Sequence, residues 1–158
     1  MSAATQMLAG ATPRVPRGWT KVLAVWSALG VDLHGSDPTV ASVKAVREAL
    51  DKVSLPTLLV DVPGGVKNAR VKAKIGVPKH AQVNKEKLKE VLGTIAGKVD
   101  EPKLVGGGLR WHSGIIAPKM GDPPPDAQVD AETSDDEEAP QTCHDEMLLA
   151  VASIRVGY

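Results

Sequence analysis

The chain has 158 residues, of which 42% are hydrophobic, and its 19 basic and 19 acidic side chains leave no formal net charge. This length supports one core of ordinary size and leaves no room for a second full domain. No stretch approaches the ~18 uncharged apolar residues that a membrane span needs, which argues against a membrane protein. The single cysteine, Cys143, cannot form an internal disulfide, so the sequence predicts a soluble intracellular protein.

Residues 1–19 contain two arginines, many small or hydroxyl-bearing side chains and no acid. This composition fits either an organellar targeting remnant, for a plastid or a mitochondrion, or a flexible N-terminal arm. The sequence therefore leaves a cytoplasmic and an organellar location open. The folded domain is expected at residues 20–158.

The first expected strand covers residues 20–29, TKVLAVWSAL, in which apolar and β-branched residues dominate. This composition predicts a buried strand in the centre of a sheet. A helix is expected at residues 38–53, because Asp37 can cap it, Pro38 suits its first position and valines and leucines recur at helical spacing.

A second strand is expected after Asn68, because apolar residues alternate there with basic ones and predict one buried and one basic face. A helix of about two turns is expected between Asn84, as its N-cap, and Gly93, as its stop. Residues 97–105 predict a third strand, at an edge because Pro102 cannot donate to a ladder.

Residues 147–157, MLLAVASIRVG, predict a final strand, although a helix is an alternative. Residues 121–142 are rich in proline and acids and hold almost no large apolar side chain, so they are expected to form a disordered acidic insertion. Together these elements predict an α+β fold with a single domain, in which a mixed sheet of four or five strands carries two helices on one face.

The charges are divided along the chain. Residues 67–103 carry ten lysines and arginines against four acids, whereas residues 122–146 carry ten acids and no basic residue. A basic strand face can bind nucleic acid, but a chain with three tryptophans, one tyrosine and no phenylalanine lacks the usual aromatic platforms. The composition therefore argues against nucleic-acid binding and favours a solvated basic face.

A first candidate site lies in the segment ALGVDLHGSDPT. Asp32 and His34 stand two residues apart and would point the same way from a strand, where they could form an acid–base pair or bind a metal. Gly30, Gly35 and Ser36 border a helix start whose backbone N–H groups could bind an anion. In the alternative interpretation, Asp32 accepts turn N–H groups, the glycines supply positive φ and His34 packs.

Two further clusters lie in GGGLRWHSG and CHDE. In the first, Arg110, His112 and Ser113 could supply an anion ligand, a base and a hydroxyl, but the segment also reads as a flexible loop. The second matches no closed zinc pattern, so no metal ligand is assigned, and the sequence does not identify a cofactor. The candidate catalytic residues are Asp32, His34 and His112, and the candidate ligand-binding residues are Gly30, Gly35, Ser36, Arg110 and Ser113.

The segments ALGVDLHGSDPTVASVKAVREAL, SLP, VKAKIGVP and DEMLLAVASIRVG resemble the "Lin" family of small conserved hypothetical proteins, whose signature near the N-terminus is GxGxDxHG. The match covers most of residues 20–118 and 145–157. Ala28 stands at the first signature glycine, whereas Gly30, Asp32, His34 and Gly35 match. The resemblance implies a site at Asp32 and His34 but supplies no activity or substrate.

Two helices on one face leave the other face of the sheet without cover, which predicts a homo-oligomer. Two functions stay open. The protein either binds or transforms a small anionic metabolite around Asp32 and His34, with Arg110 and His112, or serves as a non-catalytic interaction or accessory subunit of a larger assembly. Convergence of the histidines at one cavity would favour the first function.

Overall fold

The computed structural model describes residues 15–34, 37–52, 60–112, 114 and 146–158. The acidic insertion predicted at residues 121–142 lies outside them. The elements are β1 (Val22–Asp32), α2 (Pro38–Asp51), a short 3-10 helix η1 (Val66–Asn68), β2 (Arg70–Val77), α4 (Lys85–Leu92), β3 (Lys98–Val99), β4 (Lys103–Gly106), β5 (Leu109–His112) and β6 (Glu146–Gly157). The predicted α+β fold is confirmed, with six strands in the described sheet where the sequence predicted four or five.

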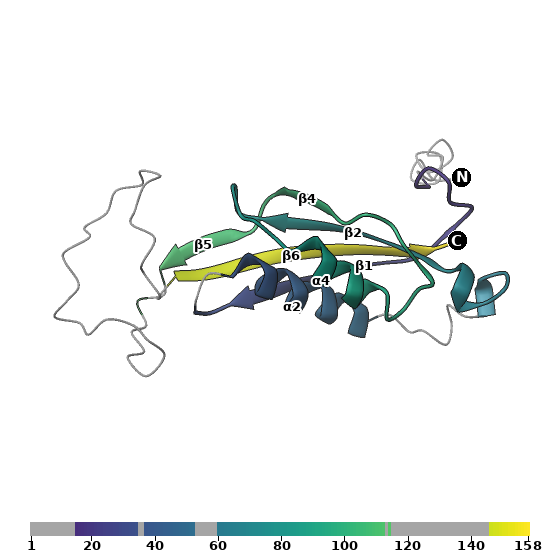
Figure 1. Cartoon of the computed structure of the whole chain (residues 1–158), viewed down its shortest axis with the longest axis horizontal. Coiled ribbons are helices and arrows are strands. Elements are labelled where there is room, and N and C mark those ends of the chain that lie inside the picture. Colours follow the sequence, from purple (N-terminus) through teal and green to yellow (C-terminus); the bar gives the residue numbers. More distant parts are fainter. Residues whose placement is uncertain (1–14, 35–36, 53–59, 113, 115–145) are drawn as a thin grey trace, which may run out of the picture.

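The sheet is mixed and is organised around β6. The main strand order is β1-β6-β2-β3, β4 pairs with β2, and β5 pairs with β6. Strand β6 is antiparallel to β1, β2 and β5, whereas β3 and β4 are parallel to β2. Figure 1 shows β6 running through the middle of the sheet.

The expectation that the first strand is central is wrong, because β1 lies at the edge of the described sheet and β6 takes the central position. The uniform apolar sequence of β1 predicts burial on both faces. In the structure, Val25 and Leu29 are instead exposed, on the face that no helix covers. The apolar run therefore indicates a sheet face that no helix covers, and not a central position in the sheet.

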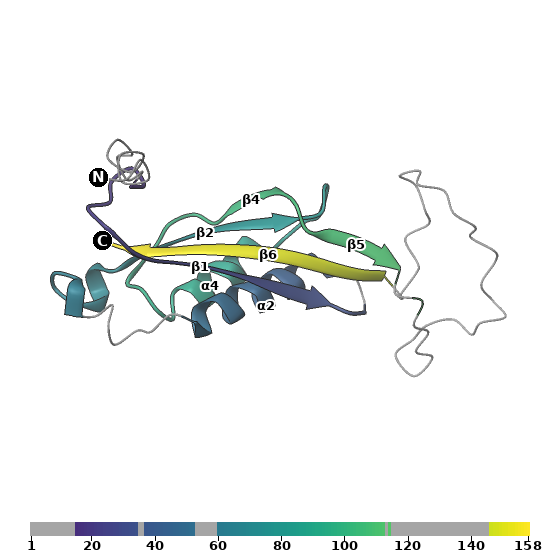
Figure 2. The same cartoon turned by 180° about the vertical axis from the view of Figure 1, so that it is seen from behind.

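Both helices cover one face of the sheet (Figures 1 and 2). Three alanines of α2 are fully buried, and their small side chains let the helix lie close to the strands. The core between the layers is built from one alternate set of strand residues and the buried side of each helix. Its largest fully buried apolar side chains are Ile75, Leu88, Leu92, Leu148, Ile154, Val46, Val71 and Val156.

The helix boundaries follow their predicted caps. The Asp37 side chain accepts hydrogen bonds from the first turn of α2, and Pro38 is the first helical residue, as expected. The helix ends at Asp51, two residues before the predicted end. The Asn84 side chain accepts from the backbone N–H of Lys87 and starts α4, and Gly93 follows its last residue.

The predicted third strand is divided in two. Strands β3 and β4 flank Pro102, which lacks the N–H that an unbroken ladder would need. Both lie beside β2 on the side away from β6, so the edge position is confirmed. The segment from Glu146 to Gly157 is a strand rather than a helix.

Trp19 anchors the chain just before β1. Its ring is buried, its Nε1 atom donates to the Asp100 carboxylate at 3.1 Å, and the Arg70 guanidinium lies 5.7 Å from the ring centroid. Arg70 and Asp100 also form an ion pair at 2.7 Å. Trp19, which the sequence placed in the N-terminal segment, is therefore packed against the domain.

The face of the sheet opposite the helices, called the open face below, is divided into two halves. Side chains here come from the other alternate set of strand residues, and Figure 2 shows this side of the sheet toward the viewer. The apolar half, next to the start of β6, comprises Leu29, Val31, Val105, Leu109, Trp111, Met147, Leu149 and Val151. The basic half comprises Lys72, Lys74, Lys103 and Arg155, with Lys98 and the Asp100-paired Arg70 beyond them on the same face.

Candidate functional site

Asp32 ends β1 and holds the loop that follows. Its Oδ2 atom accepts a hydrogen bond from the backbone N–H of Asp37 at 2.9 Å. Its Oδ1 atom lies 3.9 Å from Nζ of Lys44, which also donates to the Val31 carbonyl at 3.0 Å. The carboxylate thus joins the strand, the loop and α2, as in the alternative interpretation of this segment.

The start of α2 does not offer free N–H groups to an anion, so this part of the anion-site prediction is wrong. The Asp37 carboxylate accepts from the N–H of Thr39 at 2.7 Å and from that of Val40 at 3.3 Å. The N–H of Ala41 donates to the Asp37 carbonyl. The chain's own oxygen atoms therefore occupy the donors that a phosphate would use.

Gly30 is required by packing and not by a positive φ. A Cβ atom at this position would lie 2.1 Å from the carbonyl oxygen of Ala41 and 2.2 Å from the backbone nitrogen of Ala45. Its φ is not among the positive values of the described glycines. Ala28, two residues earlier on the same side of β1, is buried in the core, so a methyl group is tolerated there.

The alternative interpretation of GGGLRWHSG as a flexible loop is wrong, because this segment contains strand β5. Strand β5 pairs with the start of β6, so that Arg110 lies opposite Leu148 and His112 lies opposite Glu146. Nε of Arg110 is 3.2 Å from Oε1 of Glu146. Gly108 makes the preceding turn with a φ of 74°.

The sheet brings four of the predicted site residues to one end. Asp32 and Arg110 both lie opposite Leu148, on its two sides, which places their backbones about two strand spacings, or ~10 Å, apart. His34 follows Asp32 by two residues, and His112 follows Arg110 by two. Figure 1 shows the ends of β1 and β5 beside the start of β6.

Glu146 is the residue of this cluster that the sequence left out of the candidate set. It stands between the two outer strands and pairs with Arg110. The predicted last strand began one residue later, at Met147, and only the register of β5 on β6 shows what Glu146 faces. Gly35, Ser36 and Ser113 lie outside the described residues.

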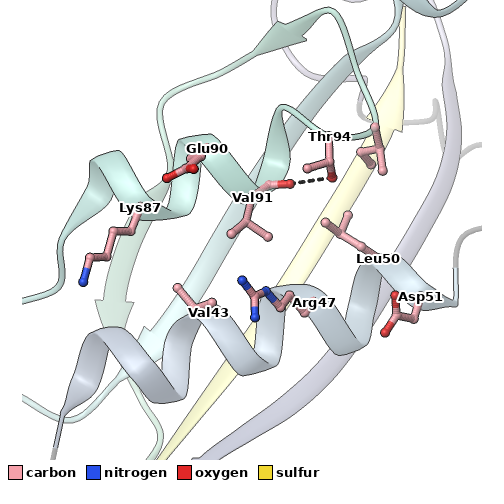
Figure 3. Close-up of a pocket in the computed structure, with 9 residues that line it drawn as sticks. Val43, Arg47, Leu50, Asp51, Lys87, Glu90, Val91 and Thr94 are labelled. Atoms are coloured by element: carbon pink, nitrogen blue, oxygen red, sulfur yellow. Dashed lines mark hydrogen bonds between the residues drawn. The ribbon is translucent and has the colours of Figure 1, made fainter.

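Two cavities border α2, and the second of them reaches Val31 and Lys44 next to Asp32. One of about 610 Å³ separates α2 from α4 and is lined by Val43, Leu50 and Val91 together with polar side chains that include Arg47 and Glu90 (Figure 3). Another of about 700 Å³ runs between β1 and the flank of α2. Within the described ranges, no three histidine, cysteine or carboxylate side chains gather as metal ligands.

The fold and the cluster define a small α+β protein with a helix layer on one face of a mixed sheet and acid, base and guanidinium groups at one sheet end. None of the helices in the described ranges is long and apolar enough to cross a membrane.

A family model of conserved hypothetical proteins, Lin0512_fam, matches residues 22–131, and the chain belongs to this family. The resemblance noted in the sequence is thereby confirmed. A crystal structure of an FtsZ-like protein of unknown function from Nostoc punctiforme is similar, with 26% sequence identity and a TM-score of 0.56. The similarity covers 88% of this chain and 97% of that one. No curated protein matches the chain.

Proposed function

We propose that this protein is a non-catalytic assembly subunit that self-associates through the apolar half of its open face. The observation that carries the proposal is the exposure of large apolar side chains there: Leu29 and Leu109 are each 58% exposed, and Trp111 is 39% exposed. They adjoin half-buried apolar residues of β6, including Leu149 and Val151. Soluble monomers rarely keep such a contiguous apolar surface in water.

The division of the open face constrains how two copies would meet. The basic half carries four cations, and stacking one basic half on another would be repulsive. A two-fold axis through the apolar half brings the two apolar surfaces together and leaves the basic halves at opposite outer ends. Apolar burial would drive the association, and charge would exclude the alternative alignments.

Replacement of Leu109 by lysine tests this interface. We expect the wild-type protein to be a dimer or larger at micromolar concentration in sedimentation velocity, and Leu109→Lys to shift it toward a smaller species. Val60→Lys is the matched control, because Val60 is 86% exposed outside the open face. A wild-type monomer, or equal association of wild type and Leu109→Lys, would refute the proposal.

A second candidate function is binding or transformation of a small anionic metabolite at the sheet end. The gathering of Asp32, Arg110, His112 and Glu146 at one sheet end, with His34 two residues beyond Asp32 in the chain, supports it. His34 would act as the acid–base or ligand group, and Arg110 would exchange its bond to Glu146 for one to the anion. The occupied start of α2 would contribute no donor.

Thermal shift measurements distinguish this second function. Inorganic phosphate and a series of small dicarboxylates would raise the Tm of the wild type, and His34→Asn would lose most of that increase. His80→Asn is the control, because His80 lies in the loop between β2 and α4. If none of these anions changes the Tm, or if both variants respond like the wild type, the metabolite function is wrong.

A further inference from the structure

Strand β1 leaves one long edge of the described sheet without a neighbouring strand. From Val22 to Val31 it contains no charged residue and no proline, the residues that usually protect an edge strand from pairing with another chain. Lys44 donates to the Val31 carbonyl and so occupies only the far end of this edge. The remaining strand is free of the usual protection.

A groove of about 700 Å³ follows this edge. Residues 27–31 of β1 form one wall, and the charged flank of α2 forms the other. This flank carries both signs of charge in a particular order along the helix: Lys44, Arg47, Glu48, Asp51 and Lys52. Arg47 and Asp51 are exposed on α2, and they line both this groove and the cavity between the two helices.

The row of charges on one α2 is complementary to the same row on a second α2 that runs in the opposite direction. If α2 lies antiparallel to a second α2, with a two-fold axis between positions 47 and 48, Arg47 faces Glu48 of the other copy and Lys44 faces its Asp51. We infer that a second copy of this chain docks along β1, with strand paired to strand and α2 beside α2. This contact is a surface distinct from the open face of the proposed function.

The register of the strand pair follows from Gly30. This residue lies against Ala41 and Ala45, so it is level with the middle of that turn of α2. Helix α2 runs antiparallel to β1, so going forward along the helix means going back toward the start of β1. The midpoint between positions 47 and 48 is therefore ~7 Å from the level of Gly30 in that direction, which is about two strand residues. The two-fold axis therefore passes close to Ala28.

Pairing centred on Ala28 places Trp26 of each copy opposite Gly30 of the other. Trp26 is 40% exposed and points to the helix side of β1, the same side as Gly30. Gly30 is itself buried under the backbone of α2, so the ring opposite it would lie along the flank of that helix. The register that the charges select therefore places the exposed ring of each copy beside α2 of the other.

The pairing would make one continuous sheet from two copies, with all four helices on the same side. Both open faces would then point in one direction. The apolar halves would lie at the two opposite ends of this pair, so each could bind a further copy through the open-face contact.

Charge reversal on α2 tests the edge contact, in a Leu109→Lys background that removes the open-face contact. Arg47→Glu or Glu48→Arg alone places like charges across the axis and should raise the dimer dissociation constant on the order of tenfold. An equimolar mixture of the two single variants should recover association as a heterodimer, visible by native mass spectrometry. The double variant should recover it as a homodimer.

The matched control exchanges the charges of Lys87 and Glu90 on α4, which should leave the dissociation constant unchanged. Ser27→Lys adds a charge beside the axis and should prevent pairing by a second route. The inference is overturned if the single variants associate like their parent or if mixing restores nothing. Failure of the open-face proposal has another signature, because Leu109→Lys would then associate like the wild type.

Discussion

The two faces of the sheet use the same strands for opposite purposes. On the helix side, Leu148, Ile154 and Ile75 are fully buried under α2 and α4. On the open face, the alternate residues of these strands include Leu149, Arg155 and Lys74, which keep contact with water. The comparison shows that the two helices complete a core on one face only, whereas the other face stays in contact with water.

The largest difference between the faces should come from truncating a core side chain. Ile154→Ala removes a fully buried side chain and should lower the free energy of unfolding by about 2–5 kcal/mol. Leu109→Ala, on the open face, should change it by less than about 1 kcal/mol in the monomer. Urea unfolding at low protein concentration measures both, and equal losses would contradict the division between the faces.

A methyl group at Gly30 should also act only on the helix side. Gly30→Ala places its Cβ atom against the backbone of α2 and should lower the free energy of unfolding by about 1–3 kcal/mol or more. Gly106→Ala is the control, because a Cβ atom there would meet no other atom within 4 Å. Thermal unfolding of both variants is sufficient, and a stable Gly30→Ala would show that α2 can move away at little cost.

Loss of the helix cap should have a smaller effect. Asp37→Ala removes the acceptor for two N–H groups of α2 and should cost about 1 kcal/mol. Asp37→Asn keeps an acceptor at the same position and should recover most of this loss. Chemical denaturation compares the three proteins; if asparagine fails to recover stability, the negative charge matters more than the hydrogen bonds.

The smallest effect is expected at the exposed pair of Lys89 and Glu101. Their hydrogen bond raises the pKa of Lys89 and lowers that of Glu101. The Glu101 contribution is therefore present above the pKa of this carboxyl in the unfolded chain and is lost as the pH falls through its lower folded value. Glu101→Gln should change the free energy of unfolding very little at pH 7 and not at all in acid, as denaturant unfolding at the two pH values would show. A large difference at pH 7 would mean that the pair is better shielded from solvent than its exposure indicates.

Local chemistry made much of the fold predictable. Asp37 and Pro38 located the start of α2, and the alternation around Ile75 located β2. The position of β1 in the sheet was not predictable, because strand order depends on pairings between residues far apart in the chain. An uninterrupted apolar run has the same sequence pattern whether its second face meets a helix or a partner.

The candidate site shows the same limit. Asp32 and His34 were expected to point the same way from a strand, but β1 ends at Asp32 and His34 lies beyond it. The carboxylate's bond to the Asp37 N–H is the one that a tight turn requires. The nearness of Arg110 and Glu146 follows only from the register of β5 on β6. No local pattern encodes a register between segments so distant in sequence.

The central place of β6 also has a consequence for synthesis on the ribosome. Strands β1 and β2 precede it in the chain, and each must wait for β6 to emerge before it gains its antiparallel neighbour. Until then, α2 has only an incomplete surface on which to bury its alanines, and the apolar β1 remains available to other chains. The nascent protein is therefore most exposed to aggregation in the interval before Glu146–Gly157 is translated, and a chaperone that holds β1 would have its greatest effect in that interval.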